Sequence, residues 1–288
     1  MQASAHRGPF PSRFTFHVSR FICLFASLRL CVKIPPDLDP NISIVVPLRN
    51  EEANVLELTR QIFAAFLGET QPLELVLVDD ASTDETWQRI LQAQRTEPRI
   101  RALRHASGGG QSAALWTGFR ASKGSIICTL DGDLQNDPAD LPRLMKELSS
   151  CDLACGVRLT RRDSGLRKIS SAVARTARRI ALGVDFRDSG CNLRVFRREV
   201  LETIPPFDGF HRFMPILADG AGLNVREVPV NHRPRTAGKT KYGVWNRLGR
   251  GVRDLVMVAL YRKRQLRHIP TEEHKTLVST KQSVVSSP

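Results

Sequence analysis

The segment Ser-Ile-Ile-Cys-Thr-Leu-Asp-Gly-Asp-Leu-Gln-Asn-Asp-Pro, residues 125–138, combines a strand signal with a cluster of oxygen ligands. Its first half is short, apolar and rich in β-branched residues, which is typical of a buried strand. Asp131, Asp133 and Gln135 follow directly, at the expected carboxyl end of that strand. Two carboxylates and an amide oxygen suit Mg²⁺ or Mn²⁺, especially when phosphate oxygens complete the shell. The alternative is an Asp-rich turn with Pro138 opening a helix.

Apolar runs alternate with helical periodicity on both sides of this segment. The expected strands are 42–47, 73–78, 100–103, 126–130, 153–158, 193–196 and 225–230, and the expected helices include 50–67, 112–122, 158–179 and 245–264. Alternation of this kind predicts an α/β, Rossmann-like fold, with a mostly parallel twisted sheet and helices on both faces. Ligands of such folds gather at the carboxyl ends of the strands.

Polar and acidic residues follow three of the predicted strands at those ends. They are the segment 47–51, the pair Asp79–Asp80 and the segment 131–133. Because the fold would bring these strand ends together, we expect them to form one site.

The chain has 288 residues, 41% of them hydrophobic and 25% charged, which describes an ordinary globular protein. We expect a poorly ordered or surface-associated extension over 1–40 and a folded domain over 41–243. An amphipathic helix over 244–266, which could lie at a membrane interface, and a disordered tail over 267–288 complete the expected organisation. Basic residues interrupt the apolar run 14–32, so no transmembrane helix is predicted.

The formal net charge of +14 implies a polyanionic partner. Nucleic acid, an anionic membrane surface and phosphorylated substrates all qualify. A nucleic-acid-binding protein is disfavoured, because the sequence shows no helix-turn-helix, zinc or aromatic-platform signature. The six cysteines are scattered and predict a reducing, cytosolic setting without a disulfide framework.

Several motifs now carry a resemblance over residues 42–261. They are Val-Val-Pro-Leu-Arg-Asn-Glu-Glu (45–52), Val-Asp-Asp-Ala-Ser-Thr-Asp (78–84), Gly-Gln-Ser-Ala-Ala-Leu (110–115), the run 130–138, and the late basic segment 235–243. In this order and spacing they resemble family 2 glycosyltransferases of the GT-A fold. The chain looks most like the branch that transfers a sugar from a nucleotide sugar to a polyprenyl phosphate, as dolichol-phosphate mannosyltransferases do.

The resemblance implies a nucleotide-sugar donor, a polyprenyl phosphate or other lipid acceptor, and Mg²⁺ or Mn²⁺. By position it implies that the nucleotide sugar contacts Pro47, Glu51, Val78, Asp80, Asp131, Gly132, Arg235 and Lys241. It also implies that the metal ligands are Asp131, Asp133 and Gln135, and that Asp131, Asp133 and Arg158 have catalytic roles. The acceptor would lie on the side of His211 and Arg212. Asp80 would accept a hydrogen bond from a ring N–H of the base, whose identity, guanine or uracil, stays open.

A phosphate acceptor is already anionic, so metal-assisted, inverting transfer to it needs no general base. The second half of the chain offers Asp188, Asp208 and His211 as its few base candidates, and turn chemistry is the simpler interpretation of the two aspartates. Transfer to a glycan or glycolipid hydroxyl, with Asp208 or His211 as base, remains the alternative. Many polyprenyl-phosphate transferases end in transmembrane helices, and no such helix is predicted from this sequence. We therefore expect a cytoplasmic protein that binds the cytoplasmic membrane peripherally, pairs with a membrane protein, or uses another acceptor.

Overall fold

The structure is a computed structural model that describes residues 40–158, 176, 179, 182–234 and 244–264, with the backbone alone for 244–252. They belong to one compact unit, Asp39–Pro288. Its elements are β1 (Ile42–Leu48), α1 (Val55–Ala65), β2 (Leu73–Asp79), α2 (Thr86–Thr96), β3 (Ile100–Arg104), α3 (Gly110–Ala121), β4 (Ile126–Thr129), η2 (Pro138–Asp140), α4 (Leu141–Glu147), β5 (Leu153–Arg158), β6 (Arg194–Arg197), η3 (Arg198–Thr203), α6 (Phe210–Gly220), β7 (Val225–Val230) and α7 (Val244–Arg262). Nearly all of the predicted extension 1–40, most of the predicted helix 158–179 and the tail 267–288 lie outside the described residues.

The described strands form one seven-stranded sheet in the order β3-β2-β1-β4-β6-β5-β7. The strands β3, β2, β1 and β4 are mutually parallel, and β5 is parallel to β7. β6 runs antiparallel to both β4 and β5. The mostly parallel α/β sheet predicted from the sequence is therefore confirmed.

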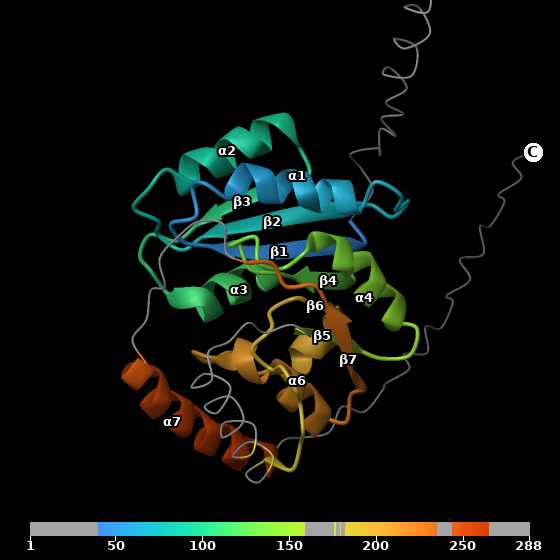
Figure 1. Ribbon diagram of the computed structural model, residues 1–288, viewed down its shortest axis with the longest axis vertical. Coiled ribbons are helices and arrows are strands. Elements are labelled where there is room, and N and C mark those ends of the chain that lie inside the picture. Colours follow the sequence, from blue (N-terminus) through green and yellow to red (C-terminus); the bar gives the residue numbers. More distant parts are fainter. Residues whose placement is uncertain (1–39, 159–175, 177–178, 180–181, 235–243, 265–288) are drawn as a thin grey trace, which may run out of the picture. The chain divides into compact units, whose positions relative to one another are not determined.

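Helices cover both faces of this sheet, as Figure 1 shows. One apolar cluster joins alternate residues of β1 to α1, α2 and α4. A second cluster joins the opposite face of the sheet to α3, α6 and the α7 residue Val258. Because β1 and β2 are buried on both faces, they appear in the sequence as continuous apolar runs.

The sequence failed to predict α6, which contains Pro215 within its span. Proline lacks a backbone N–H and normally interrupts a helix, so this segment gave no clear helical signal. Its apolar side chains are nevertheless almost all buried against the second face of the sheet. Tertiary burial stabilises this helix where local sequence preference is weak.

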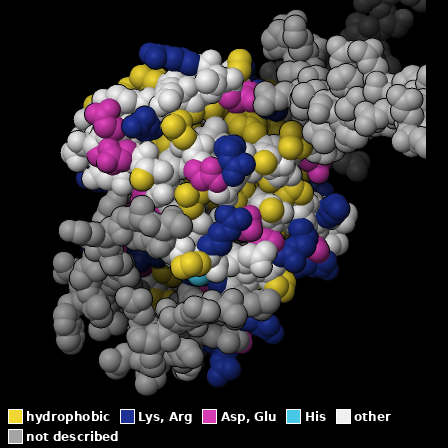
Figure 2. All heavy atoms as spheres, turned by 45° about the horizontal axis from the view of Figure 1, so that its top comes forward, with side chains coloured by type: hydrophobic (Ala, Val, Ile, Leu, Met, Phe, Trp, Pro, Cys, Tyr) yellow, Lys and Arg dark blue, Asp and Glu magenta, His cyan; other side chains and the backbone are white. Residues whose placement is uncertain are grey.

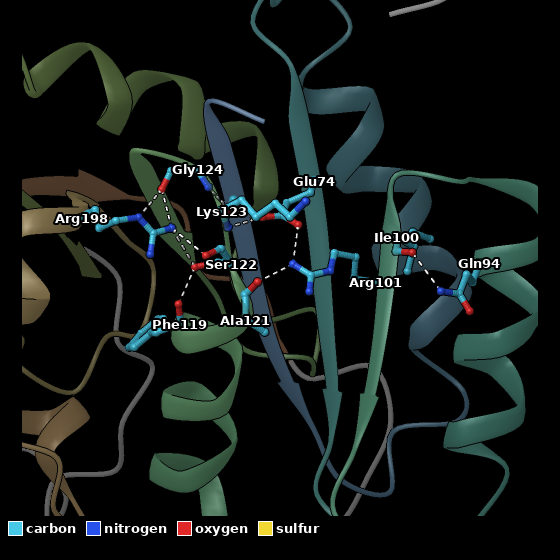
Figure 3. Close-up of polar contacts among 11 residues, drawn as sticks. Glu74, Gln94, Ile100, Arg101, Phe119, Ala121, Ser122, Lys123, Gly124 and Arg198 are labelled. Carbon is cyan, nitrogen blue, oxygen red and sulfur yellow. Dashed lines mark hydrogen bonds and ion pairs between the residues drawn. The ribbon is translucent and has the colours of Figure 1, made fainter. Parts of the chain in front are cut away.

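Helix α3 lies close to the sheet and is held firmly at its carboxyl end. A Cβ atom at Gly118 would stand 2.3 Å from Val45 Cγ1, so only glycine permits this approach. Arg101 and Arg198 donate to the backbone oxygens of Ala121 and Ser122, just where the helix ends (Figure 3). Cations at this end also complement the helix dipole.

Buried Glu74 organises the polar network next to that helix end (Figure 3). Its Oε1 accepts hydrogen bonds from Ser43 Oγ and Lys123 N, each at 2.6 Å, and its Oε2 accepts one from Arg101 at 3.1 Å. Three strands and the turn before β4 are thereby tied together at the edge opposite the strand ends that carry the acidic motifs. The network fixes α3 relative to the sheet.

The surface in Figure 2 carries acidic side chains next to basic ones, with hydrophobic side chains between them. A protein that binds the phosphate backbone of a nucleic acid would present a continuous field of positive charge on its surface. The face shown has no such field among its described residues.

Candidate active site

The three acidic strand ends predicted from the sequence lie at one edge of the sheet. β1, β2 and β4 are adjacent and parallel, so the residues after Leu48, Asp79 and Thr129 emerge on the same side. The first two loops are joined directly: Asn50 N donates to Ser82 Oγ, and Thr83 N donates to Asn50 Oδ1, each at 2.9 Å. This edge is where open α/β sheets bind their ligands.

Asp80 fastens the glycine loop that precedes α3. Its Oδ1 accepts from Gly109 N at 2.7 Å and pairs with His105 Nδ1 at 2.8 Å, while its Oδ2 accepts from Gly110 N at 2.8 Å. Arg49 approaches Oδ2 at 3.3 Å. Burial alone would raise the pKa of this carboxyl, but the hydrogen bonds from His105 and the two glycines lower it overall. Asp80 is therefore an ionised anchor for the loop.

The loop itself requires its glycines. A Cβ atom at Gly108 would lie 2.6 Å from Arg49 Nη1, and one at Gly109 would lie 2.8 Å from Ala113 Cβ. Gly110 has φ +82°, in the left-handed region. Close approach to Ala113 is thus the structural reason for Gly109, and the left-handed backbone is the reason for Gly110.

Asp131 and Asp133 lie together just beyond β4. Asp131 Oδ1 accepts hydrogen bonds from Gln111 Nε2 at 2.8 Å and from Asn192 Nδ2 at 3.1 Å. Burial and the neighbouring charge of Asp133 raise the pKa of Asp131 to about 6. Asp133 Oδ1 accepts from Gln135 N at 3.2 Å, which closes a tight turn with Leu134 at φ +60°.

Gln135 links this turn to the end of β7. Its backbone oxygen accepts from Arg233 N at 2.8 Å, and its Nε2 donates to the backbone oxygen of Arg233 at 3.5 Å. Arg233 also pairs with Asp137 at 2.7 Å. The chain that leads to Arg235 and Lys241 therefore starts beside the acidic motif, although both residues lie outside the described part.

The oxygen donors at this turn fit a divalent cation. Asp131 and Asp133 are close enough for one charge to disfavour the other, and a cation between them would relieve this repulsion. The Gln135 amide uses its nitrogen toward Arg233, so its oxygen is the atom suited to bind a metal. Within the described ranges, no group of three or more His, Cys, Asp or Glu side chains could hold a metal ion. Diphosphate and water oxygens would have to complete the shell, as Mg²⁺ usually requires.

Arg158 forms an ion pair within the protein. Its Nε and Nη2 donate to the two carboxylate oxygens of Asp188 at 2.6 and 2.8 Å. The pair lies near Asp131, and the positive charge of Arg158 acts to lower the pKa of the Asp131 carboxyl. Asp188 is therefore the partner of Arg158, and a phosphate role for this arginine stays a prediction that requires the phosphate to compete with Asp188.

The predicted acceptor side forms a cluster where α3 and α6 begin. Ser112 Oγ lies 2.9 Å from His211 Nδ1 and 3.3 Å from Asp208 Oδ1, and it accepts from Gly209 N at 2.8 Å. Arg212 pairs with Asp254 of α7 at 3.2 Å. His211 and Arg212 thus lie on a helix that the α3 residue Ser112 fastens to the donor side.

His211 is neutral at ordinary pH. Burial, reinforced by the charges of Arg194 and Arg212, lowers the pKa of His211 to about 3. A base of that strength is poorly matched to removing a proton from a sugar hydroxyl near neutral pH. The environment of His211 therefore makes this side chain poorly suited to act as a general base.

The lowered pKa predicts a pH-dependent stability. The unfolded chain, with a histidine pKa near 6.5, binds the proton before the folded protein does. The free energy of unfolding should therefore fall from about pH 6.5 toward pH 3, by up to about 1.4 kcal/mol per pH unit. Urea unfolding at about pH 8 and pH 5.5 should show about 1 kcal/mol less pH dependence in His211→Gln than in the unsubstituted protein. Equal pH dependence in both proteins would exclude a buried neutral histidine.

The remaining predicted residues lie at the same edge. Pro47 and Val78 are partners in the β1–β2 register, and Glu51 N donates to Thr86 Oγ1 at 2.8 Å. A Cβ atom at Gly132 would lie 2.4 Å from Leu48 Cδ2, so this turn packs directly on the end of β1. Their nucleotide contacts stay predictions.

The sequence gave no role to His105, Gln111 and Asn192. All three bond to acidic residues of the site. Only the antiparallel pairing of β6 with β4 could have indicated Asn192, and nothing in the sequence shows that direction.

Comparisons with known proteins agree with this geometry. The family model described as Glycosyl transferase family 2 matches residues 43–204. The dodecaprenyl-phosphate galacturonate synthase of Rhizobium johnstonii is 35% identical over 78% of this chain and 68% of its own length. The undecaprenyl-phosphate 4-deoxy-4-formamido-L-arabinose transferase of Pseudomonas aeruginosa is 37% identical over 70% of this chain and 60% of its own length. The chain thus spans about two thirds of these relatives.

Solved structures share the fold. Glucosyl-3-phosphoglycerate synthase from Mycobacterium tuberculosis, in complex with Mn²⁺, UDP and glucosyl-3-phosphoglycerate, superposes with a TM-score of 0.56 at 22% identity, over 80% of this chain and 81% of that one. A mannosyltransferase from Pyrobaculum calidifontis, in complex with GDP-Man and Mn²⁺, gives 0.53 at 22% identity, over 79% and 71%. With a family match across the acidic strand ends and relatives above 30% identity, the chain belongs to the family 2 glycosyltransferases and has their GT-A fold.

Proposed function

We propose that this glycosyltransferase moves a sugar from a nucleoside diphosphate sugar to a polyprenyl phosphate, with inversion and with Mg²⁺ or Mn²⁺. The observation that carries the proposal is the pair Asp131 and Asp133 at the end of β4, beside the loops that follow β1 and β2. The relatives named for dodecaprenyl and undecaprenyl phosphate support this acceptor class. The solved neighbours with Mn²⁺ and UDP or GDP-Man support the metal and the donor class.

In this mechanism an oxygen of the polyprenyl phosphate attacks the anomeric carbon of the sugar. One carbon–oxygen bond forms as the bond to the diphosphate breaks, and no proton has to move. Asp131, Asp133 and Gln135 would hold the metal, with Asp131 also next to the ribose and diphosphate. Held there, a divalent cation would offset the negative charge of the leaving diphosphate. Arg158, Arg235 and Lys241 would supply further positive charge to donor or acceptor phosphates.

The chain's own residues mainly position the reactants. Asp80 and the glycine loop fix the start of α3, and Pro47, Glu51 and Val78 would border the base and ribose. Holding two anionic reactants in line can supply much of the rate acceleration without acid–base chemistry. The lowered pKa of His211 supports this assignment, because a phosphate acceptor needs no base.

The decisive test is to incubate the protein with Mn²⁺, labelled UDP- and GDP-sugars, and either polyprenyl phosphate or sugar acceptors. We expect label in an acid-labile lipid product, loss of that product with EDTA, and its recovery when excess Mn²⁺ is added. Label that enters only a hydroxyl acceptor would instead support the alternative reaction.

That alternative rests on Asp208, an exposed carboxylate next to Ser112 and His211. Under the proposed function Asp208→Asn should leave transfer largely intact. Under hydroxyl transfer with Asp208 as base, it should reduce the rate by about 100-fold or more.

We further propose that α7 docks on an anionic, cytoplasmic membrane surface, where a membrane-protein partner could also bind. Among the described residues, four of the six exposed large hydrophobic side chains lie on α7: Val256, Met257, Leu260 and Tyr261. The opposite side of α7 packs on the domain through Val258 and the Arg212–Asp254 pair. Exposed Arg253, Lys263 and Arg264 supply positive charge. No described helix is both long and apolar enough to span a bilayer.

Replacing Leu260, whose side chain is 62% exposed, by glutamate should weaken sedimentation with vesicles that contain anionic phospholipid. A matched Leu67→Glu variant, altered at an exposed leucine after α1, should sediment like the unsubstituted protein. Both should retain transfer to a short-chain, water-soluble acceptor. Equal vesicle binding by the two variants would contradict docking through α7.

A further inference from the structure

Asp131 is held through one of its two oxygens. Within the described residues, both hydrogen bonds to its carboxylate end on Oδ1, from Gln111 Nε2 at 2.8 Å and Asn192 Nδ2 at 3.1 Å. A carboxylate can rotate about its last bond, but two donors on one oxygen from different elements oppose that rotation. The other oxygen, Oδ2, is thereby given a fixed direction.

The antiparallel pairing of β4 with β6 places Asn192 opposite Asp131. Thr129 and Arg194 are paired residues, and continuing that register by two residues brings Asp131 across from Asn192. Thr129 Oγ donates to the backbone oxygen of Asn192 at 2.6 Å, which fixes the approach to β6. The position of Asn192 is therefore set by the sheet.

The orientation of the Asn192 side chain is set by the carboxylate. Asn192 is 3% exposed, and its Oδ1 has no hydrogen-bond partner among the described residues. Leaving a buried amide oxygen unpaired costs about 1–3 kcal/mol. Turning the amide around would face its oxygen toward Asp131 Oδ1 and lose the bond to the anion. The Asn192 amide thus donates its N–H to Asp131 and leaves its own oxygen without a hydrogen-bond partner among the described residues.

Gln111 reaches Asp131 from a helix fixed at both ends. Asp80 accepts from the backbone N–H groups just before and at the start of α3, and Arg101 and Arg198 hold the other end. Gln111 itself is exposed, so the helix, not side-chain packing, positions it. Its neighbour Ser112 contacts the His211 cluster, so one helical turn touches both sides of the site.

We propose that Gln111 and Asn192 are positioning residues that hold Asp131 Oδ1 and present its Oδ2 to the metal–diphosphate side. This inference rests on the proposed function. Groups that orient a metal-site carboxylate typically change metal affinity or activity by about 10- to 100-fold when removed. A merely structural role would instead change folding stability and leave metal affinity unchanged.

The test is direct Mn²⁺ binding by the purified protein, followed by electron paramagnetic resonance of free Mn²⁺, with UDP and with GDP present. Gln111→Ala should bind Mn²⁺ about 10-fold more weakly, while its thermal midpoint without ligands stays unchanged. The matched control is Gln92→Ala, the same substitution at an exposed glutamine of α2 that bonds to Arg89. The control should bind Mn²⁺ like the unsubstituted protein.

Asn192→Ala provides the second arm and should weaken Mn²⁺ binding at least as much as Gln111→Ala. Because Asn192 is buried, Gln111→Ala decides the outcome if Asn192→Ala is unstable. If the Gln111→Ala variant binds Mn²⁺ as tightly as the Gln92→Ala variant, the positioning role is overturned. The proposed function would still stand in that case. An unsubstituted protein that binds no Mn²⁺ with either nucleotide would overturn both.

Discussion

Replacing Asp133 by alanine should abolish sugar transfer, with a fall in rate on the order of 1,000-fold or more, because stabilisation of the leaving diphosphate by a metal contributes several kcal/mol. Asp133 is the carboxylate that the proposed function assigns most directly to the cation, together with Gln135. The same substitution should leave the fold intact. Asp133 raises the pKa of Asp131, so removing its charge relieves a repulsion.

The Asp133→Asn variant distinguishes the role of the Asp133 charge in metal binding from the role of its side chain in the turn. Asparagine can still accept the hydrogen bond that Gln135 N donates to Asp133 Oδ1, so the turn should persist while metal binding fails. A remote control is Asp152→Asn, because Asp152 also accepts a backbone N–H, from Asn224 at 2.8 Å, at the start of β5. Transfer rates should be near normal in the control and lost in both Asp133 variants. Metal-dependent transfer at a normal rate by Asp133→Ala would contradict the metal assignment.

The central fold could be predicted because β1, β2 and β4 lie inside the sheet. Burial on both faces produces continuous apolar runs, and parallel strands require helices between them. The strand direction of β6 and the helix α6 could not be predicted in the same way. The direction of β6 depends on partners far along the chain, and Pro215 hides the helical signal of α6.

The candidate site shows the same division. The sequence indicated which acidic residues would meet, because the strand ends of a parallel sheet converge. It could not indicate which donors each carboxylate would find. The partner of Arg158 lies thirty residues away at Asp188, and two of the partners of Asp80 are backbone N–H groups, which have no signature in a sequence. Arg235 and Lys241 lie outside the described residues, so their phosphate roles stay predictions.

Asp80→Asn should destabilise the protein by about 2–4 kcal/mol, because hydrogen bonds to a charged acceptor contribute about 1.5–3 kcal/mol each. The Asp80 carboxylate accepts on both oxygens, from His105 and Gly109 on one side and from Gly110 on the other, with Arg49 close by. An amide presents an N–H₂ group to one of these sets of donors, so at least one bond is replaced by a clash of donors. Urea unfolding near pH 7 should show the loss, and Asp152→Asn should show much less.

The pH dependence of that loss has a defined sign. The pKa of Asp80 is lower in the folded protein than the ordinary value of 3.8. Its contribution to stability is therefore present above that value and disappears as the pH falls through the folded pKa. The difference in unfolding free energy between Asp80→Asn and the unsubstituted protein should narrow below about pH 4.

Asp80→Asn also separates two roles for this residue. As a contact to the nucleotide base, Asp80 would change the preference between UDP and GDP without affecting the unliganded protein. As the anchor of the glycine loop, it holds the start of α3, from which Gln111 and Ser112 reach Asp131 and His211. We therefore expect a lower urea midpoint together with weaker binding of both nucleotides. An unchanged urea midpoint with altered nucleotide preference would show that the bonds to the glycine loop add little and that base recognition is the main role of Asp80.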